Sequence, residues 1–387
     1  MKNLSIYVHW PWCKSKCPYC DFNSHSYKQY DEDEYIACVL AELDRVYANL
    51  HDSQKSQKVC SIYFGGGTPS LMQAKSIGLV IDKIKSLFDL TDNIEISTEC
   101  NPTSAEAQKM QEFASFGVNR VSIGVQSLRN DLLKFLGREH DASEAMQAIK
   151  YAFSAVKNVN FDLIYGLPEQ KLEDWQSDLD YALKVGTPHI SCYQLTIEKN
   201  TAFYNLYKNN KLIMPNVDTQ AEFFNYTRKF LMENGYENYE VSNFAKDGFE
   251  CKHNVNIWQY NSYIGVGAGA HGRYINAHGD YLATQNIKSP SQYVKAIKEK
   301  GLAYSKTEVL GNDAISFEML LLGLRLKQGV NLTHLEEITG QNSDSFMNKQ
   351  KLDLFLKEGL LEKSGDNLRL TEKSYHLLNQ IIEELLV

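Results

Sequence analysis

Short β-rich runs alternate with longer helical patterns through the first half of this 387-residue chain. Strand, helix and strand repeated in this order imply parallel strands joined by crossover helices. The predicted strands are Leu4–His9, Val59–Phe64, Ile94–Glu99, Val118–Val125, Val159–Tyr165 and Ile190–Leu195. The predicted helices are Glu34–Tyr47, Ala74–Leu87, Ala105–Phe116, Asp141–Val156 and Leu172–Val185. The pattern predicts an α/β fold built on a partial (βα)6 barrel of the TIM type.

The pattern changes after residue 200. Residues 201–300 mix a predicted helix, Thr219–Asn234, with aromatic, glycine-rich loops, and a helix-rich segment begins at Asp313. Near the end of the chain, a helix, two short strands around a Gly-Asp-Asn turn and a final helix are typical of a winged helix. We therefore expect a barrel at 1–200, an accessory and linking region at 201–312, and a helix-rich, winged-helix-like domain at 313–387.

Charge and composition exclude several classes of protein. Forty basic residues against 48 acidic ones give a net charge of −8, and residues 313–387 hold 8 Lys and Arg against 12 Asp and Glu. Nucleic-acid binding normally needs a basic patch, so no nucleic-acid partner is expected. The N-terminus lacks the apolar core of a secretory signal, and no apolar run reaches membrane-spanning length. We expect a cytoplasmic protein.

Three cysteines lie close together near the start of the chain, as Cys13-x3-Cys17-x2-Cys20. Thiolates are the natural ligands of iron–sulfur clusters, and three of them leave one iron of a four-iron cubane without a protein ligand. That iron can bind a small molecule. With His25, the same cysteines also form a Cys3His set suited to zinc, which remains the alternative. A structural disulfide is disfavoured, because the other five cysteines are scattered.

Polar residues follow several of the predicted strands, where a parallel barrel carries its chemistry. Gly65-Gly66-Gly67-Thr68-Pro69 directly follows the second strand, and consecutive glycines let backbone groups approach a ligand closely. Glu99 and Gln126 end the third and fourth strands. Arg138 and Asp162 are further candidates, although the two would also fit a structural ion pair.

The cysteine spacing, with aromatic Tyr19 directly before Cys20, resembles the signature of the radical S-adenosylmethionine superfamily. Within it, the whole chain resembles the family of oxygen-independent coproporphyrinogen III oxidase and its relatives. The resemblance implies one [4Fe–4S] cluster on Cys13, Cys17 and Cys20, with S-adenosylmethionine on the open iron. The positions that it implies for S-adenosylmethionine are Tyr7, Tyr19, Gly66, Gly67, Thr68, Glu99, Gln126, Arg138 and Asp162.

One departure separates this chain from the oxidase itself. The oxidase pattern carries an extra cysteine two residues after the third, where this chain has Phe22. Decarboxylating oxidase activity is therefore in doubt, and enzymatic activity stays open. The chain instead resembles the haem-chaperone branch of the family in these segments: HWPWCKSKCPYCDFNS, YFGGGTPS, GVQS, LGREH, FDLIYGLP, YEVSNFA and GVGAGAHG.

The same branch carries the motif H-N-x-x-Y-W, which the family associates with haem. Here the stretch runs from His253 to Trp258, with Ile257 in place of the tyrosine. Imidazole is a common axial ligand of haem iron, and an indole can stack on a porphyrin. The resemblance thus implies haem as a ligand, with His253 and Trp258 as its contacts, and haem-accepting respiratory proteins as partners. Transient membrane association and a homodimer stay open.

Residues 267–272, Gly-Ala-Gly-Ala-His-Gly, match G-x-G-x-x-G. A dinucleotide site also needs a following helix and an acidic residue about 20 positions on. The stretch that follows is turn-rich and poorly helical, so we predict a close-packed loop near the barrel mouth. Three hypotheses remain: a haem-transfer protein, a radical enzyme acting on a tetrapyrrole, and a zinc-stabilised scaffold.

Overall fold

A computed structural model describes residues 3–26, 30–103, 106 and 108–386 of the chain. Its main feature is a twelve-stranded sheet in the order β14-β13-β12-β11-β1-β4-β5-β6-β7-β8-β10-β9. The six strands predicted from the sequence form its parallel centre. They are β1 (Leu4–Trp10), β4 (Val59–Gly66), β5 (Leu90–Cys100), β6 (Arg120–Gln126), β7 (Asn158–Tyr165) and β8 (His189–Gln194). The partial parallel barrel is thereby confirmed.

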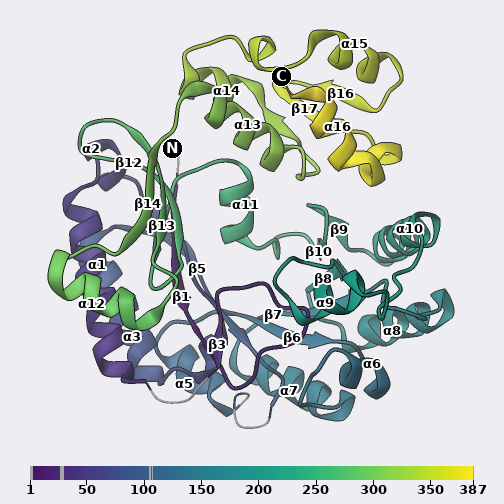
Figure 1. Ribbon diagram of the computed structural model, residues 1–387, viewed down its shortest axis with the longest axis horizontal. Coiled ribbons are helices and arrows are strands. Elements are labelled where there is room, and N and C mark those ends of the chain that lie inside the picture. The colour runs from purple at the N-terminus through teal and green to yellow at the C-terminus, as the bar shows by residue number, and fades with distance from the viewer. Residues whose placement is uncertain (1–2, 27–29, 104–105, 107, 387) are drawn as a thin grey trace.

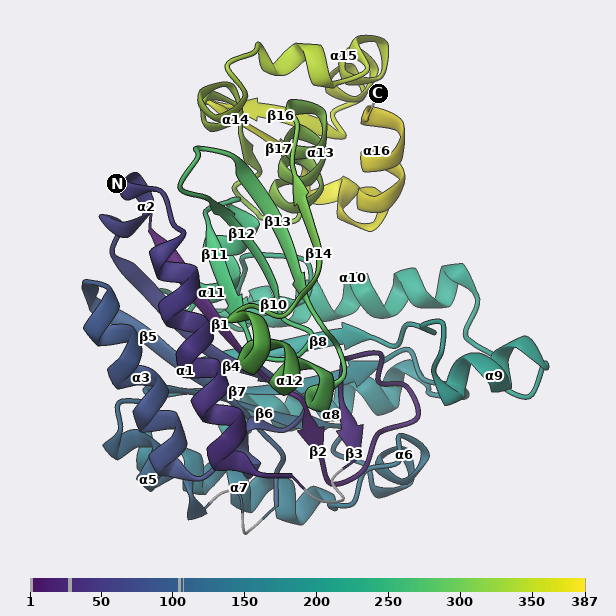
Figure 2. The ribbon, with the colours of Figure 1, turned by 60° about the vertical axis from the view of Figure 1, so that its left-hand side comes forward.

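Crossover helices cover the outer face of these strands, and Figure 2 shows α1, α3 and α5 side by side along it. Both faces of β1 and β4 are therefore buried, which explains their nearly continuous apolar sequence. The covering helices are α1 (Glu32–Ala48), α3 (Ala74–Leu87), α5 (Met110–Ser115), α7 (Ala142–Ala155) and α8 (Leu172–Val185). Helix α5 is shorter than the predicted Ala105–Phe116, although residues 105 and 107 lie outside the described part.

Capping residues fix the ends of these helices. Asp31 accepts a hydrogen bond from the Glu34 amide at the start of α1, and Asp141 with Glu144 forms a capping box on α7. Between the larger elements lie α2 (Asp52–Lys55), η1 (Pro69–Leu71) and α6 (Asn130–Phe135).

The prediction of glycine-rich loops in residues 201–300 is wrong. That region adds three strands to the barrel edge, β11 (Tyr263–Val266), β12 (His271–Ile275) and β13 (Tyr281–Asn286), and β14 (Tyr304–Val309) follows just after it. Strand β11 runs parallel to β1, and the next three are antiparallel. The glycines serve strand pairing, since a Cβ at Gly265 would lie 1.8 Å from the His271 carbonyl oxygen. The turn at 267–270 joins two strands, so this G-x-G-x-x-G stretch opens no helix.

Glu42 of α1 fixes this turn from inside the protein. Its carboxylate is completely buried and accepts hydrogen bonds from the Gly267 amide, the Asn286 amide group and the Tyr293 hydroxyl, at 2.8, 2.8 and 2.6 Å. Burial raises the pKa of Glu42 to about 7, although the three donors oppose the shift. The carboxylate therefore holds the β11–β12 turn against α1.

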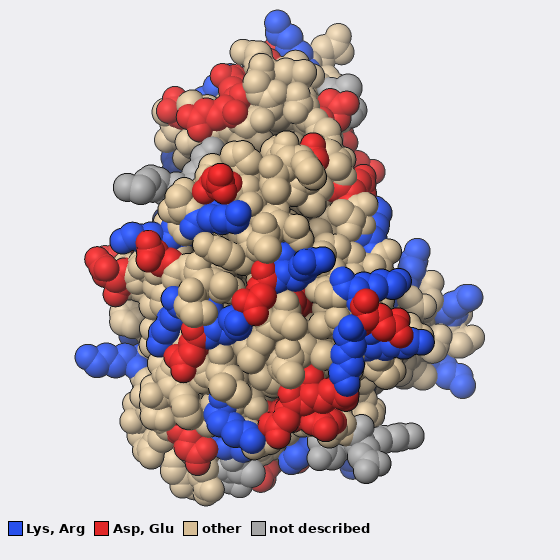
Figure 3. Space-filling model, turned by 90° about the vertical axis from the view of Figure 1, so that its left-hand side faces the viewer, with Lys and Arg blue, Asp and Glu red and all other residues tan. Residues whose placement is uncertain are grey.

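The remaining elements of residues 201–312 lie on both sides of the barrel. They are α9 (Ala202–Lys208), α10 (Val217–Glu233), β9 (Glu237–Asn238), β10 (Asn243–Ala245), α11 (Lys252–Trp258) and α12 (Pro290–Lys300). Helix α12 lies beside α1, where basic and acidic side chains occur next to one another, as Figure 3 shows. Ion pairs such as Lys298–Glu34 and Lys83–Asp44 join these outer helices. Exposed pairs of this kind contribute little stability, roughly 0–1 kcal/mol each.

The C-terminal part is built around a second hydrophobic core. Figure 1 shows its elements above the large sheet. Strands β16 and β17 pair around the predicted Gly-Asp-Asn turn, and β15 adds a third strand. The elements are α13 (Asn312–Gly323), β15 (Val330–Asn331), α14 (Leu332–Thr339), η2 (Ser343–Phe346), α15 (Lys349–Lys357), β16 (Leu361–Ser364), β17 (Asn367–Leu370), η3 (Glu372–Leu377) and α16 (Leu378–Leu385). The predicted helix-rich, winged-helix-like end of the fold is confirmed.

Three ion pairs between described residues join this part to the barrel side, and in one of them Lys327 meets Glu237 of β9 at 2.7 Å. Arg273 of β12 meets Glu318 of α13 at 2.8 Å, and Arg228 of α10 meets Glu372 at 2.7 Å while lying over the Tyr375 ring.

Candidate functional site

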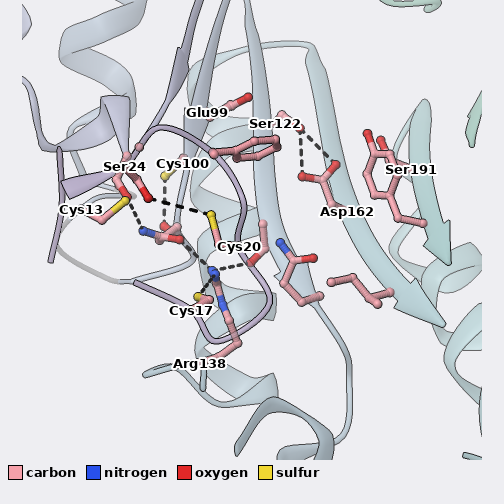
Figure 4. A pocket seen from close by; sticks show the side chains of 18 of the residues that line it. Cys13, Cys17, Cys20, Ser24, Glu99, Cys100, Ser122, Arg138, Asp162 and Ser191 are labelled. Carbon is pink, nitrogen blue, oxygen red and sulfur yellow. Dashed lines mark hydrogen bonds between the residues drawn. The ribbon is translucent and has the colours of Figure 1, made fainter. Parts of the chain in front are cut away.

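A cavity of about 420 Å³ opens at the C-terminal ends of the parallel strands. Such a volume is usual for small-molecule sites. Figure 4 shows the three cysteines at one end of it, Arg138 beside Cys17, and Glu99 and Asp162 further along the strands. The predicted residues that line this cavity are Cys13, Cys17, Tyr19, Cys20, Gly66, Gly67, Thr68, Glu99, Gln126, Arg138 and Asp162.

The three cysteines lie on one loop between β1 and α1. A short parallel pair, β2 (Trp12–Cys13) with β3 (His25–Ser26), closes the loop at its base. All three thiols are free and only partly covered. Burial raises the pKa of the Cys13 and Cys20 thiols, whereas hydrogen bonding to Ser24 opposes both shifts.

Among the described residues, no three His, Cys, Asp or Glu side chains surround a point where one metal ion would sit. His25 is bonded instead to the Lys288 carbonyl oxygen through its Nε2, at 3.1 Å. The zinc alternative would therefore need the loop to close around the ion.

Arg138 supplies a positive charge next to these thiols. Its Nη1 lies 3.3 Å from the Cys17 sulfur, and its Nη2 donates to the Asn101 side chain and the Gly124 carbonyl at 2.7 and 2.9 Å. The Nε of Arg138 is buried without a hydrogen-bond partner in the described part of the chain. A cation in this position favours a bound thiolate. Arg138 does not form the ion pair with Asp162 that the sequence left open.

The glycine loop after β4 packs directly against the cysteine loop. Gly66 has a φ of 113°, and a Cβ there would lie 2.5 Å from the His9 ring. A Cβ on Gly67 would lie equally close to the Trp12 carbonyl oxygen. The amides of Gly67 and Thr68 donate to the Trp10 and Trp12 carbonyls at 2.6 and 2.8 Å. Glycine is thus required where the two loops meet, at the cavity wall.

Two carboxylates face the cavity from β5 and β7, which lie on either side of β6. Glu99 accepts hydrogen bonds from the Tyr63 hydroxyl at 3.0 Å and the Gly66 amide at 3.2 Å. Burial, reinforced by the charge of Asp162, raises the pKa of Glu99 to about 7. Burial also raises the pKa of Asp162, which accepts from Ser122 and Asn160. Both groups can accept hydrogen bonds from hydroxyl or amine groups of a ligand.

Gln126 ends β6 in a strained backbone conformation. Its φ is 71°, in the left-handed region that residues with a Cβ rarely adopt. Such strain is concentrated at functional sites because the surrounding structure must hold it. The conformation turns the chain at the end of the strand while Gln126 lines the cavity.

Sequence reasoning missed many polar residues of the cavity, and three of them bond directly to predicted ones. Asn101 bridges Arg138 and Thr68, with its side-chain amide 3.2 Å from the Thr68 hydroxyl oxygen. Ser122 and Asn160 lie on neighbouring strands and hold Asp162. The signal was present, since both are polar residues within otherwise apolar strands.

Tyr7 is placed differently from the other predicted contacts. Its ring lies behind Gly65, stacked on Tyr63, and its hydroxyl is 3.1 Å from His9 Nδ1. It is not among the residues that line the cavity. Tyr19 does line it and packs against Phe203 of α9.

Comparison with known proteins agrees with this arrangement. The model of the radical SAM superfamily matches residues 7–182, and the model of the HemN C-terminal domain matches residues 310–375. The heme chaperone HemW of Haemophilus influenzae is 38% identical over 382 residues, which cover 98% of this chain and 97% of that protein. The heme chaperone HemW of Escherichia coli is 36% identical, with the same coverage. This chain belongs to the HemW family.

A solved structure shows the same fold. Coproporphyrinogen III oxidase (HemN) from Escherichia coli, a radical SAM enzyme, superposes with a TM-score of 0.80 over 99% of this HemW-family chain and 89% of its own. At a sequence identity of 22%, this similarity shows a common fold and nothing about function.

The stretch for which the sequence predicts haem contacts folds as helix α11 in this HemW-family chain. His253 is only 4% exposed: its Nδ1 lies 3.0 Å from the Ser61 hydroxyl, and its ring stacks on Tyr63 at 4.8 Å. Burial lowers the pKa of His253 to about 3, so the ring is neutral. Five residues on a helix correspond to a rotation of about 140°, so Trp258 faces another direction. Trp258 lies under the Arg325 guanidinium, 5.6 Å from its ring centre, at the boundary with the C-terminal part.

Within the described ranges of this HemW-family chain, no helix combines the length and the apolar character that are needed to cross a membrane.

Proposed function

We propose that this HemW-family chain is a haem chaperone, which binds haem and passes it to haem-dependent respiratory proteins. The observation that carries the proposal is the similarity, over nearly the whole chain, to proteins named heme chaperone HemW. Phe22 adds support, because it occupies the place of the oxidase family's extra cysteine and is 60% exposed beside the cavity.

The cavity residues fit a [4Fe–4S] cluster with S-adenosylmethionine. Cys13, Cys17 and Cys20 would hold the cluster, and the free thiols with the Arg138 cation beside one of them match its need for thiolates. When bound, such a cluster supplies an iron that can take up the amino and carboxylate groups of S-adenosylmethionine. The residues proposed to contact that molecule are Tyr7, Tyr19, Gly66, Gly67, Thr68, Glu99, Gln126, Arg138 and Asp162.

Different residues of the chain would position different parts of the bound cofactors. Glu99 and Asp162 would accept hydrogen bonds from ligand hydroxyl groups, and both are held in place by neighbouring donors. Arg138 connects the cysteine loop to Asn101 and to β6, so the cluster end and the strand ends form one bonded unit. We propose the barrel at 1–200 as the cofactor unit, 201–312 as the haem-binding region and 313–387 as its cover.

Haem would contact His253 and Trp258 in this proposal. Because α11 packs on β1 and β4 and buries His253, ligation by His253 requires α11 to separate from the sheet. Haem loading would then be coupled to an opening of this helix. A cytoplasmic location, transient membrane association during transfer and a homodimer complete the proposal.

An anaerobic absorption titration of the cluster-loaded protein with haem, with and without S-adenosylmethionine, tests this function. A saturable shift of the Soret band is expected, together with its loss in His253→Gln and its weakening in Trp258→Phe. Urea denaturation of both variants checks that they remain folded. A titration without saturation, or one that neither variant changes, contradicts the proposed haem site.

The fold shared with HemN keeps a second function under test, a radical enzyme that acts on a tetrapyrrole. Incubation of the reduced, cluster-loaded protein with coproporphyrinogen III separates the two. We expect no protoporphyrinogen, since Phe22 replaces the oxidase family's cysteine; its formation would favour the oxidase function.

A further inference from the structure

The segment of residues 199–217 differs in charge from the rest of the chain. It contains three lysines, Lys199, Lys208 and Lys211, and no Asp or Glu, in a protein of net charge −8. All three lysines are exposed, and no carboxylate lies within ion-pair distance of them in the part of the chain that the structure describes. Glu198 and Asp218 flank the segment on either side.

The same segment carries exposed apolar side chains. Ile213 and Val217 are each 79% exposed, more than any other large hydrophobic residue in the described ranges. Leu206 and Tyr207 of α9 are exposed as well. Figure 2 shows α9 and the chain after it projecting from the side of the barrel. Apolar residues here lie away from the core and contribute nothing to its packing.

The inner side of the segment is fixed to the barrel. Phe203 and Leu212 are buried in a small core with Leu136 and Leu195, against which Tyr19 packs. The Phe203 amide donates to the Pro18 carbonyl oxygen at 2.9 Å, on the loop that carries the three cysteines. The segment is therefore attached to the barrel through its buried side, next to the cysteine end of the cavity, while its other side is exposed.

We infer that residues 199–217 form a docking surface for the anionic surface of a phospholipid bilayer. Lysines attract anionic headgroups, and exposed Ile, Val, Leu and Tyr side chains bury themselves at the boundary between headgroups and acyl chains. The charge matches such a surface, because the segment is basic without internal acidic residues. Docking would bring the cysteine end of the barrel to the membrane. The inference rests on the membrane association within the proposed function and names its surface, and because the test below uses the chain without haem, its failure is distinguishable from a failure of haem binding.

Vesicle co-sedimentation of the full chain without haem tests this surface. Vesicles of phosphatidylcholine with about one third phosphatidylglycerol are compared with phosphatidylcholine alone, at low and high salt. We expect binding to the anionic vesicles that salt weakens. The double variant Lys208→Gln/Lys211→Gln should weaken binding by about fivefold for each lysine. Ile213→Ser/Val217→Ser should weaken it by about tenfold.

Matched changes elsewhere serve as controls. Lys229→Gln/Lys295→Gln removes two exposed lysines of other helices, and Val309→Ser with Leu354→Ser removes two other exposed apolar residues. These variants should bind as the unchanged protein does. Equal binding to neutral vesicles, or binding that the segment variants leave unchanged, overturns the inference. So does a lack of vesicle binding combined with a self-association that Ile213→Ser/Val217→Ser abolishes, because the surface would then be a protein interface.

Discussion

The cavity and helix α11 are two candidate ligand sites that the fold treats in opposite ways. The cavity gathers residues from strands β4 to β8, from β10 and from the loops between elements, from Cys13 to Asn254, around one space. The haem motif is continuous in sequence, yet its histidine is buried against β4 while its tryptophan lies at the boundary with the C-terminal part. Strand ends bring distant residues together, whereas a short helix separates near neighbours.

The largest expected effect concerns the cavity. Replacing Cys17 by Ser should abolish cluster assembly, because serine offers no thiolate to iron. Iron and sulfide per chain after anaerobic reconstitution measure this, with Cys38→Ala, a buried cysteine of α1, as the control. Full iron content in Cys17→Ser would show that the cavity does not hold a cluster through this loop.

Next comes the stability of α11. His253→Ala removes a stacked, hydrogen-bonded ring from the interior, so the free energy of unfolding should fall by about 3 kcal/mol. Trp258→Ala should change it less, because this ring is only partly buried. Urea denaturation measures both. If His253→Ala lowers the free energy of unfolding less than Trp258→Ala does, Trp258 and not His253 is the residue of α11 that stabilises the interior.

Two buried glutamates allow a comparison between a carboxylate that faces the cavity and one that is enclosed by the protein. Glu42 and Glu99 both have a pKa near 7, but Glu42 is enclosed by three donors and Glu99 faces the cavity. In the unfolded chain a glutamate has a pKa near 4.3, so between pH 5 and 7 the folded protein binds more protons. The free energy of unfolding should therefore fall as pH rises through this range, by about 3 kcal/mol for each of the two glutamates once it is fully deprotonated in the folded protein.

Glu42→Gln removes one of these titrations. The variant should lose less unfolding free energy than the unchanged protein between pH 5 and 7.5, while Glu222→Gln on exposed α10 should lose the same amount. Binding of S-adenosylmethionine, measured by calorimetry, should tighten with pH as the cavity carboxylates Glu99 and Asp162 lose their protons, and it should keep this pH dependence in Glu42→Gln. A pH dependence of binding that vanishes in Glu42→Gln would contradict this separation.

The smallest effect is expected at Gln126. Gln126→Gly relieves the left-handed backbone strain, so stability should rise by about 1 kcal/mol or less. The same change should weaken binding of S-adenosylmethionine if the side chain contacts it. Thermal denaturation and calorimetry provide the two measurements. Lower stability of the glycine variant would mean that the amide side chain, rather than the backbone, is what the fold requires there.

The sequence predicted the barrel well and the outer strands poorly, for a physical reason. Buried parallel strands appear in a sequence as short runs rich in apolar residues. Polar residues at the ends of such runs indicate the cavity, and Glu99 and Gln126 were predicted in this way. Strands β11 and β12 hold glycines that resemble turn residues, but Gly265 is needed because β12 passes too close for a side chain. The direction in which α11 presents His253 depends on packing against β4, which no local pattern in the sequence records.

Strand β14 ends one side of the large sheet and pairs only with β13. Its outer backbone amides and carbonyls are thus available to any extended chain that approaches, which is the geometry that starts amyloid-like association. Lys306 and Glu308 project from this strand and pair with each other at 2.6 Å, and an incoming strand would have to strip water from both charges. Charges at this edge oppose the addition of a further strand and so disfavour edge-to-edge association of the protein.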